Sequence, residues 1–575
     1  MMAFIWKYIK QDSALLLLAP FLMLLSVAAD LLQPKLMADI VDIGVANGDV
    51  TFIKGKALIM LITTFGGLLA GISSYYLAAR STARAGERIR SALFSRIMTF
   101  SHKELDYFSV PTLITRMTND VSHVQGVILS IQNTFIQVPF LLIGGLFMAI
   151  TLSQRLSLIF LVAIPALIST IALVLVRAVK VFPVVQKKLD AMNRIARETL
   201  LGMPIIKGYL AEPLERQRFD KANQDLYDWQ LKSALLMILM SPFIMITFNF
   251  STVAVLWMGG YQVYGGQLEV GKIMAFSTYL SQILMAVMMS SFVIYMFSQA
   301  QASLARLQEV IDSGSSIVSP TQPQKSQGYT LIFDDVSFRF DEQSPKSTLE
   351  NINLSISENE RIGIVGPTGS GKSTLVGLML RFYDPQRGKI TLGGVPLKDL
   401  DLLALRKKIG LVQQENTVLS GSIEENLKIA APDASPDDMQ KALDQAMASE
   451  LYINRVGGLT TAIQQRGKDL SGGQQQRLSI ARVLLQKPEI LILDDSTSAL
   501  DVLTEKRFLD ALDDQKAHQT QVIIAQRIST LQRCDRIVVM NCGKIEAIGD
   551  HESLLKTSPT YMAIAENQSD RKVSA

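Results

Sequence analysis

Apolar residues form long, nearly uninterrupted stretches in the first half of the chain and short stretches between charged residues in the second half. A helix that crosses the hydrocarbon of a bilayer needs about 20 mostly apolar residues. The pattern therefore predicts six membrane-spanning helices, at residues 14–33, 57–79, 135–153, 156–177, 235–258 and 274–297. We prefer six spans to five because Ser153, Gln154 and Arg155 interrupt the long stretch 135–177 where a tight turn between two antiparallel spans would fall.

Basic residues mark the side of the membrane on which the chain ends lie. They gather in two long connections between spans, as Arg80, Arg84, Arg88, Arg90, Arg96, Lys103 and Arg116 in one and Lys180, Lys187, Lys188, Arg194 and Arg197 in the other. Because such loops favour the cytoplasmic side, both connections and both chain ends are predicted to be cytoplasmic. Their helical periodicity predicts helices that extend beyond the bilayer and return through short turns near 105–111 and 208–215, where they would contact a cytosolic domain.

The second half of the chain has the pattern of a soluble α/β domain. Residues 313–327 are rich in Ser, Pro and Gln, a composition typical of a linker. After it, apolar runs at 331–333, 361–365 and 490–493 alternate with helical patterns, which predicts a largely parallel sheet. We therefore predict an α-helical six-span transmembrane domain at 1–305, a linker at 306–330 and an α/β domain at 331–570, a candidate for nucleotide binding.

Composition and charge narrow the function. Hydrophobic residues make up 49% of the chain and charged residues 19%, as expected for a protein in a lipid bilayer. The net charge of +4 and the lack of a continuous basic tract argue against nucleic-acid binding. Cys534 and Cys542 form no CxxC pattern or disulfide framework, which fits a reducing cytosol. The apolar run after Lys10 is interpreted as a first span, because no convincing signal-peptide cleavage site follows it.

The strongest local motif is GPTGSGKST, which lies between an apolar strand and a helical run. Glycines let backbone N–H groups approach phosphates, the lysine neutralises the β- and γ-phosphates, and the following serine ligates Mg²⁺. The motif therefore predicts that ATP and Mg²⁺ bind here. Its residues are Gly366, Pro367, Thr368, Gly369, Ser370, Gly371, Lys372, Ser373 and Thr374.

A second motif identifies a family. The strand at 491–493 ends in Asp494, where a carboxylate can reach the magnesium ion. Between it and the P-loop, LSGGQQQR at 470–477 resembles the signature motif of the ABC ATPases. The resemblance implies an α/β ATPase domain that pairs head to tail with a second one, so that each ATP lies between one chain's P-loop and the other chain's signature residues. Those residues here are Ser471, Gly472, Gly473 and Gln474.

Other residues match the family in register. Phe340 resembles the aromatic residue that stacks on adenine, Gln414 the Q-loop glutamine and Asp501 the D-loop aspartate. The resemblance implies that Ser373, Gln414 and Asp494 hold Mg²⁺. In the apolar half, 30–49 and the RMTND run at 116–120 resemble the multidrug exporter branch, whose six-span half-transporters dimerise.

Two catalytic positions depart from the family. Asp495 stands where a glutamate usually polarises the attacking water, and Gln526 stands where a histidine usually contacts the γ-phosphate. A shorter carboxylate positions water poorly, and an amide carries no positive charge, so we expect slow hydrolysis. Before the signature, Gln465 also replaces a usual glutamate. With the other motifs intact, this pattern is typical of the degenerate subunit of a heterodimeric exporter; the alternative is tolerated drift in a slow homodimer.

The expected function is ATP-driven export of hydrophobic or amphipathic small molecules across the cytoplasmic membrane, by this chain and a second ABC half-transporter, with the ATPase domain in the cytosol. Alternatives are an ATP-gated channel or regulator and an importer with the exporter fold. Asp30 is a candidate partner for a cationic substrate or an interfacial residue, and Trp257, Tyr261 and Tyr264 are explained by anchoring at the membrane surface. Methionines in the last two spans offer an adaptable substrate surface or simply face lipid: Met237, Met240, Met245, Met285, Met288, Met289 and Met296.

Overall fold

The computed structural model describes residues 2–341, 347–498, 500–513 and 519–573. The chain folds into two compact units. The first, here called the helical unit, comprises Met1–Met98 and Val110–Ser313, and the second, the sheet unit, comprises Thr99–Ser109 and Gly314–Ala575. The short segment Thr99–Ser109 therefore leaves the helical unit and folds with the sheet unit.

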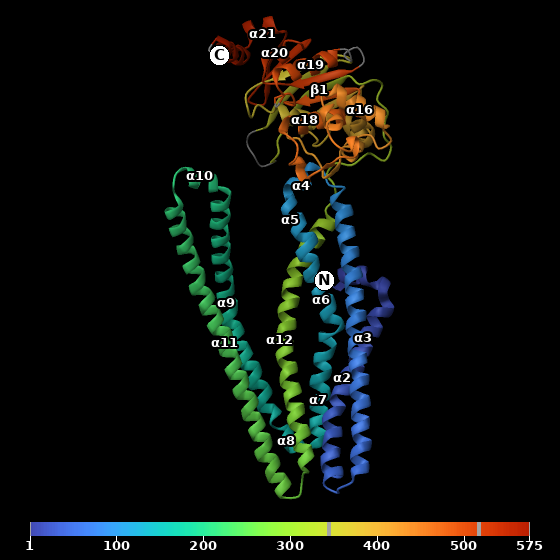
Figure 1. The fold of residues 1–575 in the computed structure, drawn as a ribbon, viewed down its shortest axis with the longest axis vertical. Helices are drawn as coiled ribbons and strands as arrows, with labels where there is room; N and C mark the ends of the chain where they lie inside the picture. Colours follow the sequence, from blue (N-terminus) through green and yellow to red (C-terminus); the bar gives the residue numbers. More distant parts are fainter. Residues whose placement is uncertain (1, 342–346, 499, 514–518, 574–575) are drawn as a thin grey trace. The chain divides into compact units, whose positions relative to one another are not determined.

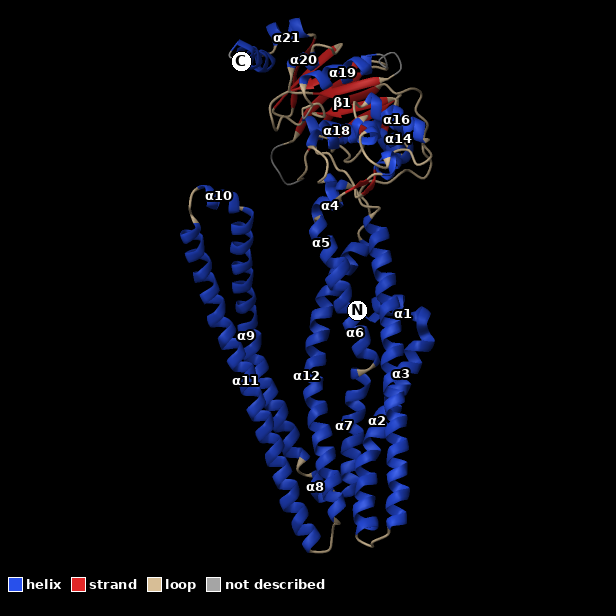
Figure 2. Cartoon of the chain, viewed as in Figure 1, coloured by secondary structure: helices blue, strands red, loops and turns tan. Residues whose placement is uncertain are grey.

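The helical unit contains only helices and their connections among the described residues (Figures 1 and 2). Its helices are α1 (Met2–Ile9), α2 (Ser13–Asp39), α3 (Val50–Ile97), α5 (Val110–Thr115), α6 (Val121–Gln132), α7 (Thr134–Leu152), α8 (Gln154–Ser157), α9 (Phe160–Leu201), α10 (Met203–Gly208), α11 (Glu212–Tyr264) and α12 (Val270–Asp312). Short 3₁₀ or π turns join them at η1 (Lys10–Asp12), η2 (Ile40–Val45) and η3 (Arg116–Asp120).

Six helical segments are long and apolar enough to cross a membrane, within the described part of the chain. Five of them have 42 residues or more, which is much longer than a bilayer requires; α3 has 48 residues and α11 has 53. Figure 1 shows α9 and α11 side by side and joined through α10, and α2 packs along α3. Helix α12 packs against α7 and α2, where the fully buried Tyr279 donates a 2.6 Å hydrogen bond to the Leu31 carbonyl.

The sheet unit is built on a six-stranded sheet with the order β12-β11-β3-β10-β9-β6. A four-stranded sheet, β2-β1-β4-β5, and a two-stranded sheet, β7-β8, complete it (Figure 2). The strands are β1 (Leu331–Phe338), β2 (Leu349–Ile356), β3 (Arg361–Val365), β4 (Arg387–Leu392), β5 (Val395–Pro396), β6 (Ile409–Val412), β7 (Gly421–Ser422), β8 (Ala462–Ile463), β9 (Ile490–Asp494), β10 (Thr520–Ile524), β11 (Arg536–Asn541) and β12 (Lys544–Gly549).

Helices cover the sheets of this unit, and most begin at a polar capping residue. They are α4 (His102–Phe108), α13 (Lys372–Met379), α14 (Leu402–Lys408), α15 (Ile423–Lys428), α16 (Pro436–Gln445), α17 (Glu450–Ile453), α18 (Gly472–Leu485), α19 (Val502–Asp513), α20 (Ile528–Leu531), α21 (His551–Thr557) and α22 (Pro559–Val573), with 3₁₀ turns η4 (Leu397–Asp399), η5 (Gly458–Thr460) and η6 (Gln465–Gly467).

The central strands determine where a site can form. All residues of β3, β9 and β10 are buried, as expected for parallel strands covered on both faces. β10 pairs in parallel with β3 on one side and with β9 on the other, so the carboxyl ends of the three strands lie next to one another. Ligands of such sheets bind at those ends. The phosphate loop follows β3, Asp494 ends β9, and Gln526 follows β10.

Candidate nucleotide-binding site

The loop from Gly366 to Gly371 joins β3 to α13 and contains three glycines, which bring its backbone close to its surroundings. A Cβ atom on Gly366 would lie 2.1 Å from the Met540 carbonyl oxygen, so the backbone there is too close to β11 for any side chain. Gly371, with φ of 98°, precedes the first residue of α13. Around Gly369 there is open space. Glycine therefore brings backbone N–H groups to a free surface at the start of a helix, an arrangement suited to phosphate.

Lys372 is the cation of this loop. Its ammonium group donates hydrogen bonds to the carbonyl oxygens of Gly366, at 2.8 Å, and Pro367, at 2.9 Å. Burial lowers the pKa of Lys372, while the charges of Asp494 and Asp495 oppose that shift. The ammonium is thus held between the loop and two carboxylates, within reach of any phosphate in the pocket.

A carboxylate and a hydroxyl meet beside this lysine. Asp494 is the last residue of β9, and its carboxylate accepts a hydrogen bond from the Ser373 hydroxyl. Burial raises the pKa of Asp494, and the Ser373 hydrogen bond and the Lys372 charge oppose that effect. Mg²⁺ prefers hard oxygen ligands and is commonly held by one or two protein groups together with phosphates. The donor set of Ser373 and Asp494 fits such an ion.

The two departures from the family are in direct contact. Asp495 has φ of 48°, and its backbone N–H donates to the Ile524 carbonyl across the end of the sheet. The Gln526 side-chain amide donates a 2.9 Å hydrogen bond to Asp495 Oδ2. Burial raises the pKa of Asp495, while the Gln526 hydrogen bond and the charges of Lys372 and Arg527 act in the opposite direction. The Asp495 carboxylate is thus hydrogen-bonded to Gln526, which lies two residues beyond the end of β10.

One pocket of about 250 Å³ brings most of the expected residues together. It is lined by Thr348, Thr368, Gly369, Gly371, Lys372, Ser373, Thr374, Gln414, Asp494, Asp495, Ile524 and Gln526. Motifs that lie up to 158 residues apart in sequence, Thr368 and Gln526 among them, therefore share one cavity. Phe340, Asp501 and the signature residues are not part of its lining.

The signature residues lie at the start of α18, and two of them form its N-terminal capping box. Ser471 is the N-cap: its hydroxyl accepts from the Gln474 N–H, and the Gln474 side chain accepts from the Ser471 N–H. This capping box leaves Gly472 in open space at the surface. Asp501 likewise caps α19 by accepting from the N–H groups of Leu503 and Thr504. The D-loop residue Ala499 lies outside the described residues.

Phe340 belongs to an aromatic group beside α4. Its ring meets those of Phe338 and Tyr383 edge to face, at 5.0 and 5.2 Å. The Tyr383 hydroxyl donates a 3.1 Å hydrogen bond to Asp106 of α4, and burial together with Asp106 raises the pKa of Tyr383 to about 12. Phe340, Tyr383 and Asp106 line a cavity of about 400 Å³.

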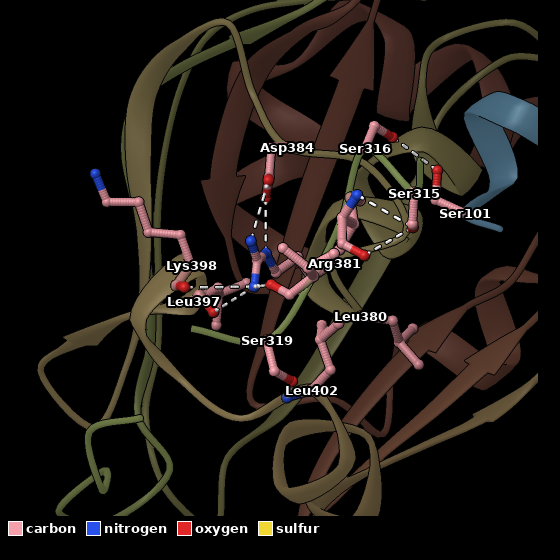
Figure 3. Close-up of polar contacts among 12 residues, drawn as sticks. Ser101, Ser315, Ser316, Ser319, Leu380, Arg381, Asp384, Leu397, Lys398 and Leu402 are labelled. Atoms are coloured by element: carbon pink, nitrogen blue, oxygen red, sulfur yellow. Dashed lines mark hydrogen bonds and ion pairs between the residues drawn. The ribbon is translucent and has the colours of Figure 1, made fainter. Parts of the chain in front are cut away.

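Within the sheet unit, polar contacts join α4 and residues 316–318 to the segments that follow the strands (Figure 3). The hydroxyls of Ser101 and Ser316 share a 2.8 Å hydrogen bond. The buried Arg381 pairs with Asp384 and also donates to the carbonyl oxygens of Val318, Leu397 and Lys398. These contacts hold residues 316–318 against the end of the four-stranded sheet.

Sequence reasoning missed one contact with the Gln526 segment. The Gln568 side chain in α22 bonds the backbone on both sides of Arg527. A signal was present: Tyr561, Ile564, Ala565 and Gln568 follow the i, i+3, i+4, i+7 spacing of one helix face. A half-buried polar residue at the end of a core-facing stripe is placed to hydrogen-bond the backbone that the stripe faces.

With this geometry established, known proteins can be compared. A family model described as the ABC transporter transmembrane region matches residues 16–287, and one described as ABC transporter matches residues 349–498. An uncharacterized ABC transporter ATP-binding protein of Bacillus subtilis, YfiB, is 36% identical over 569 residues, covering 99% of each chain. The chain belongs to the ABC transporter family. A counterpart in Mycobacterium tuberculosis is 34% identical over 574 residues, covering 99% of this transporter and 98% of that protein.

A solved structure shows the fold of this ABC transporter. A bacterial Atm1-family ABC exporter with ATP bound superposes with a TM-score of 0.78 at 24% identity, covering 96% of this chain and 97% of that one. The predicted fold class, six apolar spans followed by an ABC ATPase domain, is confirmed. The transporter is therefore a multi-pass membrane protein with a cytosolic ATPase domain and an exporter-type fold. Proteins of this type act as dimers.

Proposed function

We propose that this transporter is one subunit of a heterodimeric ABC exporter, and that its own ATP site hydrolyses slowly. The observation that carries the proposal is the contact between Gln526 and Asp495 in the same pocket as Lys372 and Ser373. The phosphate-binding parts are complete, whereas the two groups that act on the attacking water are altered. Such a site retains ATP better than it cleaves it.

The chemistry of Asp495 supports slow turnover. A general base must come within hydrogen-bond reach of the water it activates, roughly 2.6–3.2 Å between heavy atoms. Asp495 has one methylene less than the family's glutamate, and one of its oxygens accepts from Gln526. Gln526 is uncharged and therefore offers a weaker interaction to a developing phosphate charge than a protonated histidine. Both effects raise the barrier to hydrolysis at this site.

The rest of the site is assigned to binding. Phe340 stacks on adenine, the loop from Gly366 to Thr374 holds the phosphates, and Lys372 neutralises them. Ser373, Gln414 and Asp494 hold Mg²⁺, which supplies charge stabilisation to the phosphates. On the partner's nucleotide, Ser471, Gly472, Gly473 and Gln474 complete the faster site, and Asp501 is the D-loop aspartate. The open space around Gly472 supports a role in contacts with a second chain.

The substrate is assigned to hydrophobic or amphipathic small molecules, exported across the cytoplasmic membrane. An apolar cavity of about 470 Å³ between α7, α9 and α12 supports this class. Its lining is aliphatic apart from Ser290, with Leu142, Ile143, Leu146, Ile164, Ile168, Ile171, Ala172, Leu175, Ile283 and Val287. Such a surface binds apolar molecules through burial rather than through charge. Resemblance to an exporter in fold supports the outward direction.

ATPase activity of the chain alone, and of the chain with a partner subunit, tests the proposal. Wild type is compared with Asp495→Glu plus Gln526→His, each reconstituted in lipid. Slow turnover alone, restoration by the partner and a second active site in the double variant are the expected results. Brisk activity of the lone chain that the substitutions leave unchanged would instead favour a homodimer.

A further inference from the structure

Helix α22 returns to the edge of the nucleotide site after the last strand. Tyr561 anchors it, fully buried in the core, with its hydroxyl 2.8 Å from His551 Nδ1. Ile564 and Ala565 pack on the same core one turn later. Gln568 lies two turns from Tyr561 on the same face, so the helix aims this amide at the segment after β10. The packing of α22 on the core therefore determines the direction in which the Gln568 side chain points.

The Gln568 amide makes two hydrogen bonds to backbone. Its Nε2 donates to the Gln526 carbonyl at 2.6 Å, and its Oε1 accepts from the Ile528 N–H at 3.0 Å. Ile528 is the first residue of α20, and the N-cap Arg527 provides no side-chain cap. The first N–H groups of a helix have no partner within the helix. Gln568 supplies one and, with its other end, fixes the carbonyl two residues earlier.

These two bonds determine the position of a group that faces the pocket. The Gln526 side chain lines the nucleotide pocket and donates to Asp495. Because Gln568 holds the backbone on both sides of Arg527, the Gln526 amide has a fixed origin from which to reach the pocket. We propose that Gln568 is a positioning residue, through which α22 sets the contact of Gln526 with the terminal phosphate of ATP.

The proposal rests on the nucleotide site assigned above, and it predicts a selective effect. Gln526 stands at the position that meets the γ-phosphate, which ADP lacks. Loss of the Gln568 amide therefore weakens ATP binding and leaves ADP binding unchanged. A general loss of folding would weaken both nucleotides alike. The ratio of the two dissociation constants separates positioning from structural damage.

The test is equilibrium binding of fluorescent ATP and ADP analogues to the full chain in lipid nanodiscs. Gln568→Met keeps the side-chain length and removes both hydrogen bonds, and is expected to weaken ATP binding about fivefold, as one net hydrogen bond would. Asn567→Ala is the matched control, because within the described part of the chain Asn567 donates a side-chain hydrogen bond to the Ala563 carbonyl of its own helix and does not contact the Gln526 segment. A chain ending at Asn567 is expected to behave like Gln568→Met, and one ending at Ser569 like wild type.

A double-mutant cycle completes the design. In a Gln526→Ala background, Gln568→Met is expected to have no further effect on the ratio of ATP to ADP binding, because the group it positions is gone. If Gln568→Met weakened the binding of ATP and ADP equally, or changed neither, the ratio of the two dissociation constants would be unchanged. Either result would overturn the positioning role. Failure of wild type to bind either nucleotide would overturn the nucleotide site itself, and the role of Gln568 with it.

Discussion

Gln526 and Asp495 lie at the ends of neighbouring parallel strands, and the amide of the first donates a 2.9 Å hydrogen bond to the carboxylate of the second. Each residue departs from the family pattern, and the two departures meet. The amide satisfies one carboxylate oxygen and stabilises its charged form, while burial favours the neutral form. Because these two residues contact each other, the effects of changing them are coupled. Each single variant and the double variant therefore have to be compared.

The pH dependence of hydrolysis at this site follows from that contact. A base must be deprotonated, and the pKa of Asp495 is raised, so activity is expected to fall on acidification at a pH above the usual aspartate value. Because the Gln526 hydrogen bond lowers that pKa, Gln526→Ala should move the acidic limb further toward neutral pH. Steady-state ATPase rates over about pH 5 to 8 measure this. A limb that stays in place would show that Asp495 is not the titrating group.

The phosphate loop offers a steric prediction. In Gly366→Ala the new Cβ would lie 2.1 Å from the Met540 carbonyl oxygen, and backbone on both sides cannot yield. Nucleotide binding is expected to fall at least about tenfold, and more if the loop moves away from β11. Gly394→Ala is the control: its φ of 81° costs strain of about 1 kcal/mol, nothing lies within 4 Å, and the residue is outside the pocket lining. Equal losses in both variants would show that general backbone strain, rather than contact with β11, causes the loss.

Much of this site could be read from the sequence because its chemistry is local. GPTGSGKST carries the turn, the cation and the hydroxyl within nine positions, between a strand and a helix that its neighbours predict. The departures at Asp495 and Gln526 were visible for the same reason, each lying next to a matched motif. What the sequence did not contain is that these two side chains bond each other. That contact depends on the pairing of β9 with β10, which no local pattern specifies.

Two other features depended on tertiary structure. The chain leaves the helical unit at Thr99 and returns at Val110. A turn near 105–111 that contacts a cytosolic domain was expected from the sequence, but its individual partners, such as Tyr383 for Asp106 and Ser316 for Ser101, follow from the fold. The apolar windows alone do not give the ends of the helices: α11 runs from Glu212 to Tyr264, whereas its apolar window begins at 235, and only the helical periodicity of the charged connections indicated an extension beyond the bilayer. Charged helical turns beyond the bilayer carry no apolar signal.

Arg381 is expected to be important for the stability of the sheet unit. It is buried and serves Asp384 together with three backbone carbonyls (Figure 3). Arg381→Ala removes the buried donor of this network and should lower the free energy of unfolding by about 2–3 kcal/mol. Lys389→Ala, which breaks an exposed pair with Asp334, should cost less than about 1 kcal/mol. Thermal unfolding measures both variants, and the melting temperature of Arg381→Ala should fall further than that of Lys389→Ala. Similar falls in the two would refute the role assigned to burial of Arg381.

The stability that Tyr383 contributes is expected to depend on pH in the alkaline range. The pKa of Tyr383 is raised from 10.0 to about 12, so the hydroxyl remains protonated and donates to Asp106 at all ordinary pH values. A raised pKa contributes stability that is fully present below the unfolded value and is lost as pH rises through the folded one. The destabilisation caused by Tyr383→Phe should therefore be constant below pH 10 and shrink between 10 and about 12. Melting temperatures measured along this range check it; a difference that already shrinks near neutral pH would contradict it.

The ion pair of Asp120 with Arg306 in the helical unit predicts an asymmetry. The Asp120 side chain is only 3% exposed, whereas that of Arg306 is 45% exposed. Arg306→Met leaves a buried carboxylate without its partner, a loss of about 3–5 kcal/mol. Asp120→Asn leaves a guanidinium that water can reach, so it should cost about 1 kcal/mol.

The double variant of this pair separates charge from packing. In the Arg306→Met background, Asp120→Asn removes the buried carboxylate that has lost its partner. The double variant should therefore be more stable than Arg306→Met alone. Unfolding in lipid nanodiscs, followed by intrinsic fluorescence, ranks the three variants. If Arg306→Met were no worse than Asp120→Asn, burial of the carboxylate would not be the source of the asymmetry, and contacts of the Arg306 side chain with Ser303 on the same helix would have to account for the pair.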